Sequence, residues 1–541
     1  MQEKFDIDRQ CLGAIPIIDS VIEKIGLRAL LKENISNDRY VDAILVLLKN
    51  ILVERNALYA IGEWAAQYDP ILVHGGKLSD DVIARALDRL FEADRASLMT
   101  RIVLAAIQNY GIDTSQIHQD TTSVKVTGAY TRQNPKAVKL ARGHSKDHRP
   151  DLKQLVYELS VTRDGAIPML VKSHDGNRTD DTLHWDNWQT LRGVLGRSDF
   201  LYVADSKACV SKVLLNIDRN QGRFVTILPR TRSEVVQFSE KAHTSLVRWE
   251  KVAARRSKKS GKIDLFEVAS GLHQMREGFR LYWFRSSEKA RRDLNAREEK
   301  IALAIDHIHS LADPKRKKRP RTEKAMRGQA DAIINRFGVA HWITAEVALE
   351  RAEKFKQLRR GRSTGDSMYR RVVYWIPSID CSRNEAAISV ASAMDGLFPL
   401  TTNTDLDALA VLKAYKYQPK LERRHALLKS SLKVAPVFLK KNDRIEALMF
   451  VYFLAQLVCA LVERQLRKAM HEKGMKQIQI LPEDRPSTAP TAEQILRTFS
   501  TRARHLIKAK NGKLLQTFTD PLTPVQTQVL DLLSIPTTAY V

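Results

Sequence analysis

Three acidic residues stand where a carboxylate is poorly suited to a purely structural role. Asp120 lies in a strand-like segment and precedes three hydroxyl side chains, and Asp205 ends the apolar segment FLYVAD. Burying an unpaired carboxylate is costly, whereas the end of a strand in an α/β sheet is a common ligand site. Either aspartate alone could instead cap the next helix. The third acid is Glu422, the single carboxylate in the basic segment LKAYKYQPKLERRHALLKSSLK, residues 412–433.

The surroundings of Glu422 allow two interpretations. Pro419 fits the first turn of a helix, so a helix is predicted to begin there and to carry Glu422 and Lys429 two turns apart on one face. In the simpler interpretation Glu422 forms exposed ion pairs with Arg423 or Lys420, each worth less than about 1 kcal/mol. In the other it is a ligand for a hard metal ion inside a DNA-binding surface.

Carboxylates inside a basic surface suit the cleavage of a phosphodiester. Cations attract the phosphates, while cleavage needs a metal ion to activate water and to stabilise the leaving oxygen. Two ions about 3.5–4 Å apart do both. We therefore predict that Asp120, Asp205 and Glu422 hold two Mg²⁺ ions, with Mn²⁺ as a possible substitute. This hypothesis requires the three carboxylates to converge.

Composition supports a polyanionic partner. The 541 residues include 88 Lys and Arg against 62 Asp and Glu, a net charge of +26, and phosphate backbones are the commonest counterpart of such a surplus. A solubility surplus or a ribosome-like structural role would give the same balance. The length predicts two to four domains, and 44% hydrophobic residues are typical of a globular chain.

Compartment signals favour a reducing cytoplasm without membrane association. Four single cysteines argue against a disulfide framework and a thiolate zinc site. The N-terminal segment MQEKFDIDRQ lacks the apolar core of a signal peptide. Residues 447–462 are apolar apart from Gln456, but a bilayer span needs about 20 such residues, so a helix in a protein core is predicted.

Periodicity divides the chain into five regions. Helical spacing predicts a helical N-terminal domain that could bind DNA, and a later change to strands, a hairpin and alternating helices and strands predicts a mixed α/β sheet. Three basic runs interrupt this rhythm: RRSKKSGK (255–262), KRKKRPR (315–321) and RRGR (359–362). The predicted regions are the N-terminal domain 1–110, the core 111–230, an insertion 231–370, the second part of the core 371–480 and a helical C-terminal region 481–541.

Individual segments carry the same prediction. Strands are expected in IHQDTTSVKVTG, KQLVYELSVTR, IPMLVKSH, DFLYVADS and RFVTILPR, and FRLYWFR within the insertion is strand-like. PTAEQILRTFSTRARHLIKAK is expected to be a helix that begins with a capping box, Thr491 to Gln494.

The order of the three acids resembles the DDE transposases, and more narrowly the IS4/IS1634-type insertion-sequence transposases. The family's C-terminal signature is Tyr, two residues, Arg, three residues, Glu, six residues and Lys. Tyr415, Glu422 and Lys429 match it, and Gln418 stands where Arg is usual. Other similar blocks are LSDDVIARALDRL (78–90), GHSKDHRPDLKQL (143–155), DGNRTDD (175–181), VADS (203–206) and DGLFPLTTNT (395–404). Asp205 and Glu422 are 217 positions apart, which matches the β-rich insertion of this group.

This resemblance implies an α/β fold with a ribonuclease-H-like core. The core is a mixed five-stranded sheet with helices, interrupted by an α+β insertion and flanked by helical N- and C-terminal regions. The implied activity is cut-and-paste transposition, in which metal-dependent cleavage at the element ends is followed by 3′-hydroxyl attack on target DNA. The implied partners are terminal inverted repeats and target DNA, bound by a homodimer on paired ends in the bacterial cytoplasm, with the nucleoid.

Further side chains are predicted to contact DNA. The family Tyr and Arg are associated with gripping a terminal phosphate, which Gln418 could hydrogen-bond but not neutralise. The loop GHSKDHRPDLKQ could hold phosphate near the site, or it could order only on binding. The predicted DNA contacts are Tyr415, Gln418, Lys429, Lys146, His148 and Arg149.

Other candidate residues have simpler roles available to them. His118, His144, His148 and His174 have no standard zinc spacing, and solvent-facing or phosphate-contacting roles are favoured. The rival carboxylates are Asp147, Asp151, Asp175, Asp180 and Asp181, and Asp175 suits a turn. Trp185, Trp342 and Trp375 could stack on an extruded base, but core packing is favoured for each.

Two alternative functions stay open. A metal-dependent nuclease that cuts without joining would share the three acids but need no sequence-specific end recognition. A non-catalytic DNA-binding protein derived from a transposase would be expected to have lost an acid, and all three acids are present.

Overall fold

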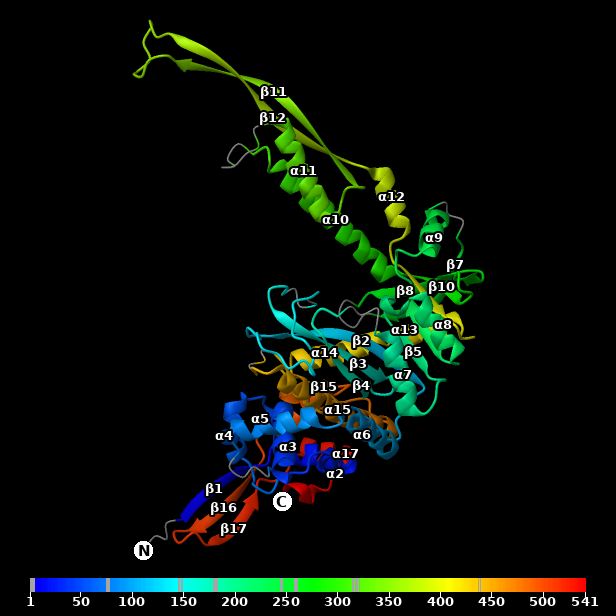
Figure 1. Cartoon of the computed structure of the whole chain (residues 1–541), viewed down its shortest axis with the longest axis vertical. Coiled ribbons are helices and arrows are strands. Elements are labelled where there is room, and N and C mark those ends of the chain that lie inside the picture. The colour runs from blue at the N-terminus through cyan, green and yellow to red at the C-terminus, as the bar shows by residue number, and fades with distance from the viewer. Residues whose placement is uncertain are drawn as a thin grey trace. The chain divides into compact units, whose positions relative to one another are not determined.

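The chain forms two compact units (Figure 1). Unit 1 comprises Met1–Thr226, Thr402–Asp405 and Ala410–Val541, and unit 2 comprises Ile227–Thr401 and Leu406–Leu409. The computed structural model describes residues 5–73, 78–144, 146, 149–178, 183–243, 247–256, 261–313, 316, 320, 322–435, 437 and 439–541.

The large mixed sheet contributes five strands to unit 1, in the order β4-β3-β2-β5-β6. The strands are β2 (Gln116–Val126), β3 (Lys153–Thr162), β4 (Pro168–His174), β5 (Leu201–Ala204) and β6 (Arg223–Ile227). β3 pairs antiparallel with both β2 and β4, whereas β5 pairs parallel with both β2 and β6. Helices α7 (His184–Leu195) and α8 (Ser211–Arg219) make the crossovers that parallel strands need. This mixed order confirms the predicted ribonuclease-H-like core.

A long apolar helix, α15 (Asn442–Glu472), forms the centre of the helical part of unit 1. It is long and apolar enough to cross a membrane, but 94% of its most apolar window is buried inside the protein. Helices α1, α3, α5 and α6 pack against it. The N-terminal elements are α1 (Ile15–Lys24), α2 (Leu27–Asn34), α3 (Asp38–Val53), η1 (Leu58–Ala60), α4 (Ile61–Ala66), α5 (Asp80–Glu92) and α6 (Arg95–Tyr110). The prediction of a core helix is therefore confirmed.

The single polar residue of the apolar stretch, Gln456, links three elements. Its amide oxygen accepts from the Tyr157 hydroxyl of β3 at 2.8 Å, and its amide nitrogen donates to the carbonyl oxygen of Arg424 at 2.8 Å. Arg424 belongs to α14 (Gln418–Lys429) and forms a buried ion pair with Glu463 of α15 at 3.0 Å. The core helix thereby fixes both the sheet and the helix that carries Glu422.

The C-terminal region contains strands that periodicity did not indicate. The capping box of Thr491 and Gln494 is present, but helix α16 (Ala492–Arg497) ends early. The basic end of the expected helix is instead β16 (Ala503–Ala509), which pairs with β1 (Phe5–Cys11) and β17 (Leu514–Thr519). The expectation of a continuous helix was wrong because pairing with the distant N-terminal strand outweighs local spacing. The remaining elements are β14 (Ile478–Gln479), η4 (Pro482–Asp484), β15 (Pro486–Ser487), α17 (Pro524–Leu533) and η5 (Thr537–Tyr540).

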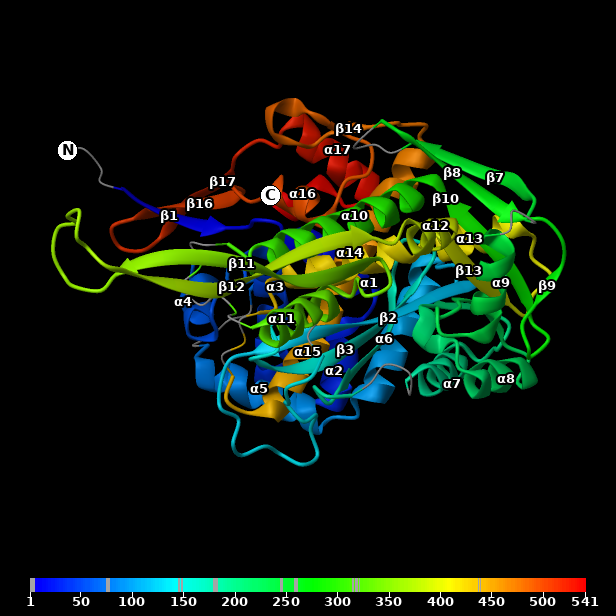
Figure 2. The ribbon, with the colours of Figure 1, turned by 90° about the horizontal axis from the view of Figure 1, so that it is seen from above.

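Unit 2 contains both strands and helices. Its strands β13, β10, β8 and β7 are neighbours in that order, and β9 pairs with β10. A separate hairpin of β11 and β12 runs beside α10 and α11 and continues past them (Figure 2). The bounds are α9 (Ser233–His243), β7 (Trp249–Arg256), β8 (Ile263–Ala269), β9 (His273–Gln274), β10 (Arg280–Ser286), α10 (Ser287–His309), α11 (Glu323–Phe337), β11 (Ile343–Gln357), β12 (Tyr369–Arg383), α12 (Glu385–Ala393) and β13 (Leu397–Thr402).

The buried link through Gln456 predicts a specific loss of stability. Gln456→Leu should lower the free energy of unfolding by about 2–4 kcal/mol, because the Tyr157 hydroxyl and the Arg424 carbonyl lose their partner without access to water. Urea unfolding measures the change. His471→Leu, at an exposed position of the same helix, is the control. Equal effects of the two substitutions would contradict a structural role for the link.

Candidate active site

Strand register brings the two aspartates together. In the parallel pairing of β2 with β5, His118 lies opposite Val203. Two residues further along each strand are Asp120 and Asp205, so the two acids are neighbours where β5 ends, on strands spaced about 4.8 Å apart. Burial raises the pKa of Asp205, and the charge of Asp120 raises it further. The predicted pair therefore shares one end of the sheet.

Helix α14 is fixed on β2 through contacts on both sides of Glu422. The Gln418 amide oxygen lies 3.0 Å from His118 Nδ1, and its nitrogen donates to the Gln119 carbonyl at 3.2 Å. Two turns later, His425 Nε2 lies 3.7 Å from Asp120 Oδ2. Glu422 follows Gln418 by four residues and precedes His425 by three, so it lies on the same face of the helix.

Glu422 itself is exposed. In the part of the chain that the structure describes, its carboxylate forms no ion pair, so the simple interpretation of exposed pairs is not realised there. The predicted start of the helix at Pro419 is confirmed, because this residue lies in the first turn of α14.

The Tyr415 side chain lies in the electrostatic field of all three acids. It ends α13 (Ala408–Tyr415), directly before α14. Burial raises the pKa of Tyr415, and the charges of Asp205, Glu422 and Asp120 each raise it further. Three carboxylates separated widely in sequence thus act on one phenol, which stays protonated at neutral pH.

Oxygen donors of this kind suit Mg²⁺, which binds through few carboxylates and keeps several waters. Among the described residues, no group of three or more His, Cys, Asp or Glu side chains is close enough to form a ready-made metal site. The register fits a pair of protein ligands, Asp120 and Asp205, with Glu422 on the adjoining helix face.

The predicted DNA contacts occupy different environments. Lys146 Nζ donates to the Thr121 carbonyl at 2.6 Å and lies 3.6 Å from Asp120 Oδ1, inside the site. Arg149 is exposed and pairs with Asp151 through two hydrogen bonds of 2.8 and 2.7 Å. Lys429 lies in the last turn of α14, and its charge acts on His425. His148 lies outside the described residues, as do the rival acids Asp147, Asp180 and Asp181.

Two histidines that sequence reasoning missed flank the aspartates. His425 is buried, and burial with the charges of Lys146 and Lys429 lowers its pKa to about 3. His184 of α7 is also buried, and its Nε2 lies 3.8 Å from Asp205 Oδ1. His425 could have been predicted, because it follows Glu422 by three residues on the same helix face. No sequence pattern links His184 to Asp205, since only the folded chain brings them together.

The expectation that His118 faces solvent or phosphate was wrong. Its side chain is fully buried between Gln116 and Gln418. Burial lowers the pKa of His118 to about 4. The rival carboxylate Asp175 accepts from the Lys139 amide and begins a turn, as expected.

A basic cleft of about 460 Å³ lies along another side of α14. Lys420 and Arg423 are its exposed cations, and Arg467 of α15 adds a third, half-buried one. Glu463 and Glu493 also line the cleft, but its cations outnumber them, which suits a phosphate backbone.

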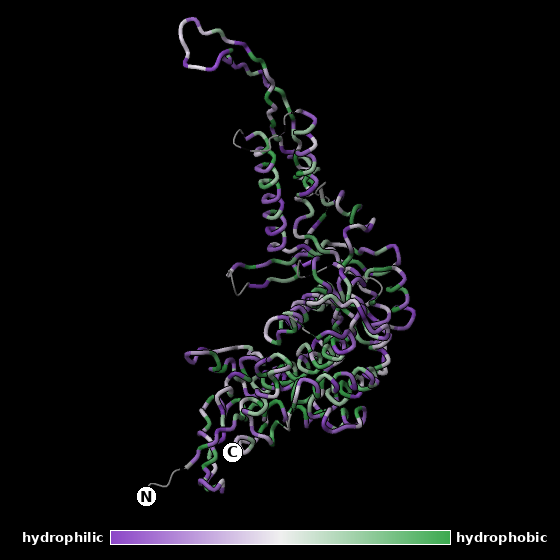
Figure 3. Tube along the Cα trace, turned by 60° about the vertical axis from the view of Figure 1, so that its left-hand side comes forward, coloured by the Kyte–Doolittle hydropathy of each residue, from purple (hydrophilic) through white to green (hydrophobic). Residues whose placement is uncertain are grey.

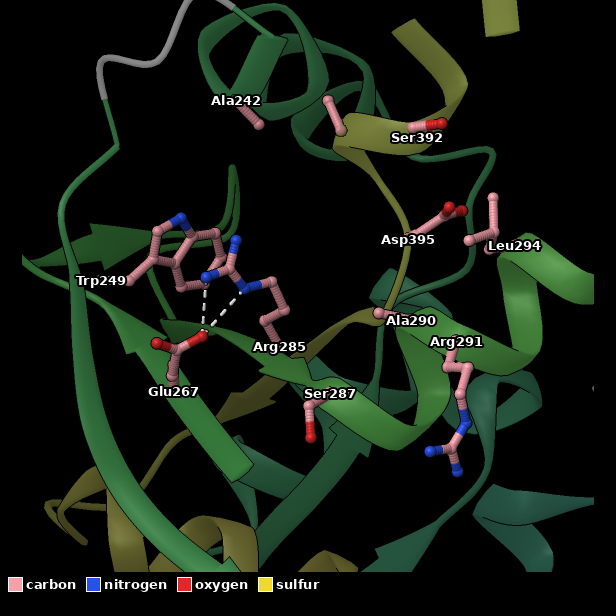
Figure 4. A pocket seen from close by; sticks show the side chains of 11 residues that line it. Ala242, Trp249, Glu267, Arg285, Ser287, Ala290, Arg291, Leu294, Ser392 and Asp395 are labelled. Carbon is pink, nitrogen blue, oxygen red and sulfur yellow. Dashed lines mark hydrogen bonds and ion pairs between the residues drawn. The ribbon is translucent and has the colours of Figure 1, made fainter. Parts of the chain in front are cut away.

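A second cleft, of about 530 Å³, lies in unit 2 (Figure 4). Its Arg285 stacks on the Trp249 ring at 4.6 Å and bonds to Glu267 at 2.7 Å. Its other carboxylate, Asp395, is held by Arg297 at 2.7 Å. Because arginines already hold both acids, the cleft does not compete with unit 1 as a carboxylate site.

Comparisons with known proteins give a distant structural similarity. No protein-family model matches the chain, and no curated protein matches it in sequence. Among solved structures, the chain is similar to the piggyBac transposase in a synaptic complex with hairpin DNA, with a TM-score of 0.39 and 10% identity. The match covers 90% of this chain and 76% of the other. The IS4/IS1634 assignment therefore stays a prediction.

The buried histidines predict a loss of stability in acid. The folded pKa of His118, about 4, is below the value of about 6.5 for an exposed histidine, so its contribution is complete above pH 6.5 and is lost as the pH falls toward 4. This loss amounts to roughly 3 kcal/mol at most. His118→Gln should reduce the difference between the free energies of unfolding at pH 7.5 and pH 4.5, measured in urea.

The matched control is His471→Gln, at an exposed position, which should keep the wild-type difference. If His118→Gln also keeps that difference, buried His118 is not a source of acid sensitivity.

Proposed function

We propose that this protein is a DNA transposase of the DDE type, similar to the IS4/IS1634 group, which cleaves DNA at element ends and joins the freed end to target DNA. The observation that carries the proposal is the parallel register of β2 and β5, which sets Asp120 and Asp205 side by side, with Glu422 on the helix that docks on β2. Structural acids would be distributed over the surface or paired with arginines. Asp120 lies in β2, Asp205 directly follows β5, and Glu422 lies in α14, which packs on β2.

The metal requirement follows from the donor chemistry. Asp120 and Asp205 would hold the ions from neighbouring strands, and Glu422 would complete the set from α14. When bound, two Mg²⁺ ions supply water activation and stabilisation of the leaving oxygen. Mn²⁺ offers similar oxygen coordination.

The chain's own residues then position the DNA. The protonated Tyr415 phenol can donate a hydrogen bond to a phosphate oxygen. Lys146 offers a cation next to Asp120, and Lys429 offers another at the end of α14. The amide of Gln418 already binds β2, so its proposed phosphate contact needs a change of partner, whereas Arg149 is exposed on the surface.

Two transfers at phosphorus make up the proposed reaction. In the first, a water oxygen bonds to phosphorus and the bond to the 3′-oxygen breaks, which leaves a 3′-hydroxyl. In the second, this hydroxyl attacks a target phosphodiester and displaces another 3′-oxygen. The neutral state of His425 keeps a further positive charge from competing with cations at the aspartates.

The proposed partners are terminal inverted repeats and target DNA, bound by a homodimer on paired ends, in the bacterial cytoplasm with the nucleoid. A metal-dependent nuclease would use the same acids without joining. The α14 cleft favours neither, because its cations bind phosphate irrespective of sequence.

Cleavage of the protein's own element ends tests the proposal. Purified protein and Mg²⁺ are incubated with a DNA fragment that spans the flanks of its gene, and cuts are mapped on both strands. We expect discrete cuts at inverted repeats and transfer of the 3′ ends to a second DNA. Glu422→Gln should slow cutting by about a thousandfold, since losing a ligand to the metal removes several kcal/mol of transition-state stabilisation.

Glu472→Gln, at the exposed end of α15, is the matched control and should cut like the wild type. Scattered metal-dependent cuts would indicate a nuclease. DNA binding without cuts in the wild type would indicate a non-catalytic relative and overturn the proposal.

A further inference from the structure

Within the described residues, only the base of the β11–β12 hairpin packs against other elements of unit 2. Each strand has 15 residues, so the ribbon spans about 50 Å. Its base packs on a buried cluster of α10 and α11 through Ile343, Ala345, Val347 and Ile379. From Leu349 outward the side chains of β11 are mostly exposed, and the ribbon continues beyond the helices (Figures 1 and 2). An isolated two-stranded ribbon is marginally stable in water, so this half is suited to a partner.

The two faces of the outer half differ in character. Opposite residues in an antiparallel pair share a face, and the register places Phe355 opposite Arg371 and Arg351 opposite Trp375. On this face Glu353 pairs with both arginines. Trp375, expected in a core, is 57% exposed there. This face is therefore aromatic, and part of its charge is neutralised.

The other face is cationic. Lys356 lies opposite Arg370, and Lys354 lies two residues away on the same side. The loop from Leu358 to Met368 adds Arg359, Arg360 and Arg362 at the tip, which Figure 3 shows as a mostly hydrophilic segment. None of these six cations forms an ion pair within the described chain. Residues 350–376 hold eight Lys and Arg against three acids.

We infer that the outer half of the β11–β12 ribbon is an arm that binds double-stranded DNA. A two-stranded β-ribbon fits the major groove of B-DNA, which is about 12 Å wide. The cationic face and the arginine tip would contact phosphates, and the exposed aromatic side chains would cover sugar and base surfaces. A second copy of the chain, carrying the same positive ribbon, is the less suitable occupant because like charges repel. The inference rests on the proposed function only in taking DNA as the polyanion.

Charge removal at the tip tests this inference without any cleavage. The full-length protein is titrated, in EDTA, onto a fluorescent 30-base-pair duplex at several salt concentrations. Replacing three tip arginines should weaken binding at 0.1 M salt at least about tenfold. It should also reduce the slope of log K against log salt by about 2.7, since each phosphate contact contributes about 0.9. The tip variant is R359A/R360A/R362A.

A matched control removes three exposed lysines at the end of α15 and its following turn. This control, K468A/K473A/K476A, has the same net charge as the tip variant and should keep most of the wild-type slope. Equal losses of DNA affinity and of salt slope in the two variants would show an effect of net charge alone. That result would contradict the inference of a DNA-binding arm. A tip variant that binds DNA like the wild type but loses self-association would show that the ribbon contacts a second copy of the chain. That result would also contradict the inference of a DNA-binding arm.

A second variant guards against a local effect on the loop. K354Q/K356Q/R370Q removes charge from the strand face, and it should reduce the slope like the tip variant. The cleavage assay decides the proposed function separately. If the wild type cuts element ends but both ribbon variants keep the wild-type slope of log K against log salt, only the DNA-binding arm is rejected. If the variants have reduced slopes but the wild type does not cut DNA, only the transposase function is rejected.

Discussion

The docking of α14 on β2 is the interaction on which the candidate site depends. Asp120 and Asp205 are placed by the sheet itself, since parallel register sets neighbouring strands side by side. Glu422 arrives from a segment more than two hundred residues later, and only the helix contact sets its position. Gln418 and His425 make that contact on either side of it, while Arg424 and Gln456 connect the opposite side of the helix to the core. Loss of either set would leave two acids without the third.

The candidate site contains both charged lysines and neutral histidines. Lys146 and Lys429 supply positive charge, but the two histidines nearest β2 and α14 are held neutral by burial. Of the three acids, Glu422 forms no ion pair in the described part of the chain, whereas Lys146 lies 3.6 Å from Asp120. The buried pair of Arg424 and Glu463 shows the contrast, because there an acid and a base are matched to each other and serve the core.

The sequence predicts the sheet well because each strand is marked by its own residues. The strands around Asp120 and Asp205 are predicted from local composition, and Asp205 marks the end of β5. Local composition fails where the partner is distant: residues 503–509 follow a helix and are basic, yet β1 draws them into a sheet. The environments of His118 and His184 likewise depend on helices that no window of sequence contains. Gln456 illustrates the opposite case, since a lone polar residue in an apolar helix marks a buried hydrogen-bond link.

The two units have different structural properties: unit 1 has a large buried core, and unit 2 carries an exposed cationic surface. A sheet that positions a candidate active site needs a rigid, buried core, and unit 1 provides it around α15. A surface that follows a duplex needs exposed cations that are not paired with acids. The β11–β12 ribbon meets this demand by anchoring its base in a small helical core, and Arg359, Arg360 and Arg362 outnumber Asp366 at its tip. Chain length between Asp205 and Glu422 is therefore used to add a surface, while strand register and helix docking keep the acids together.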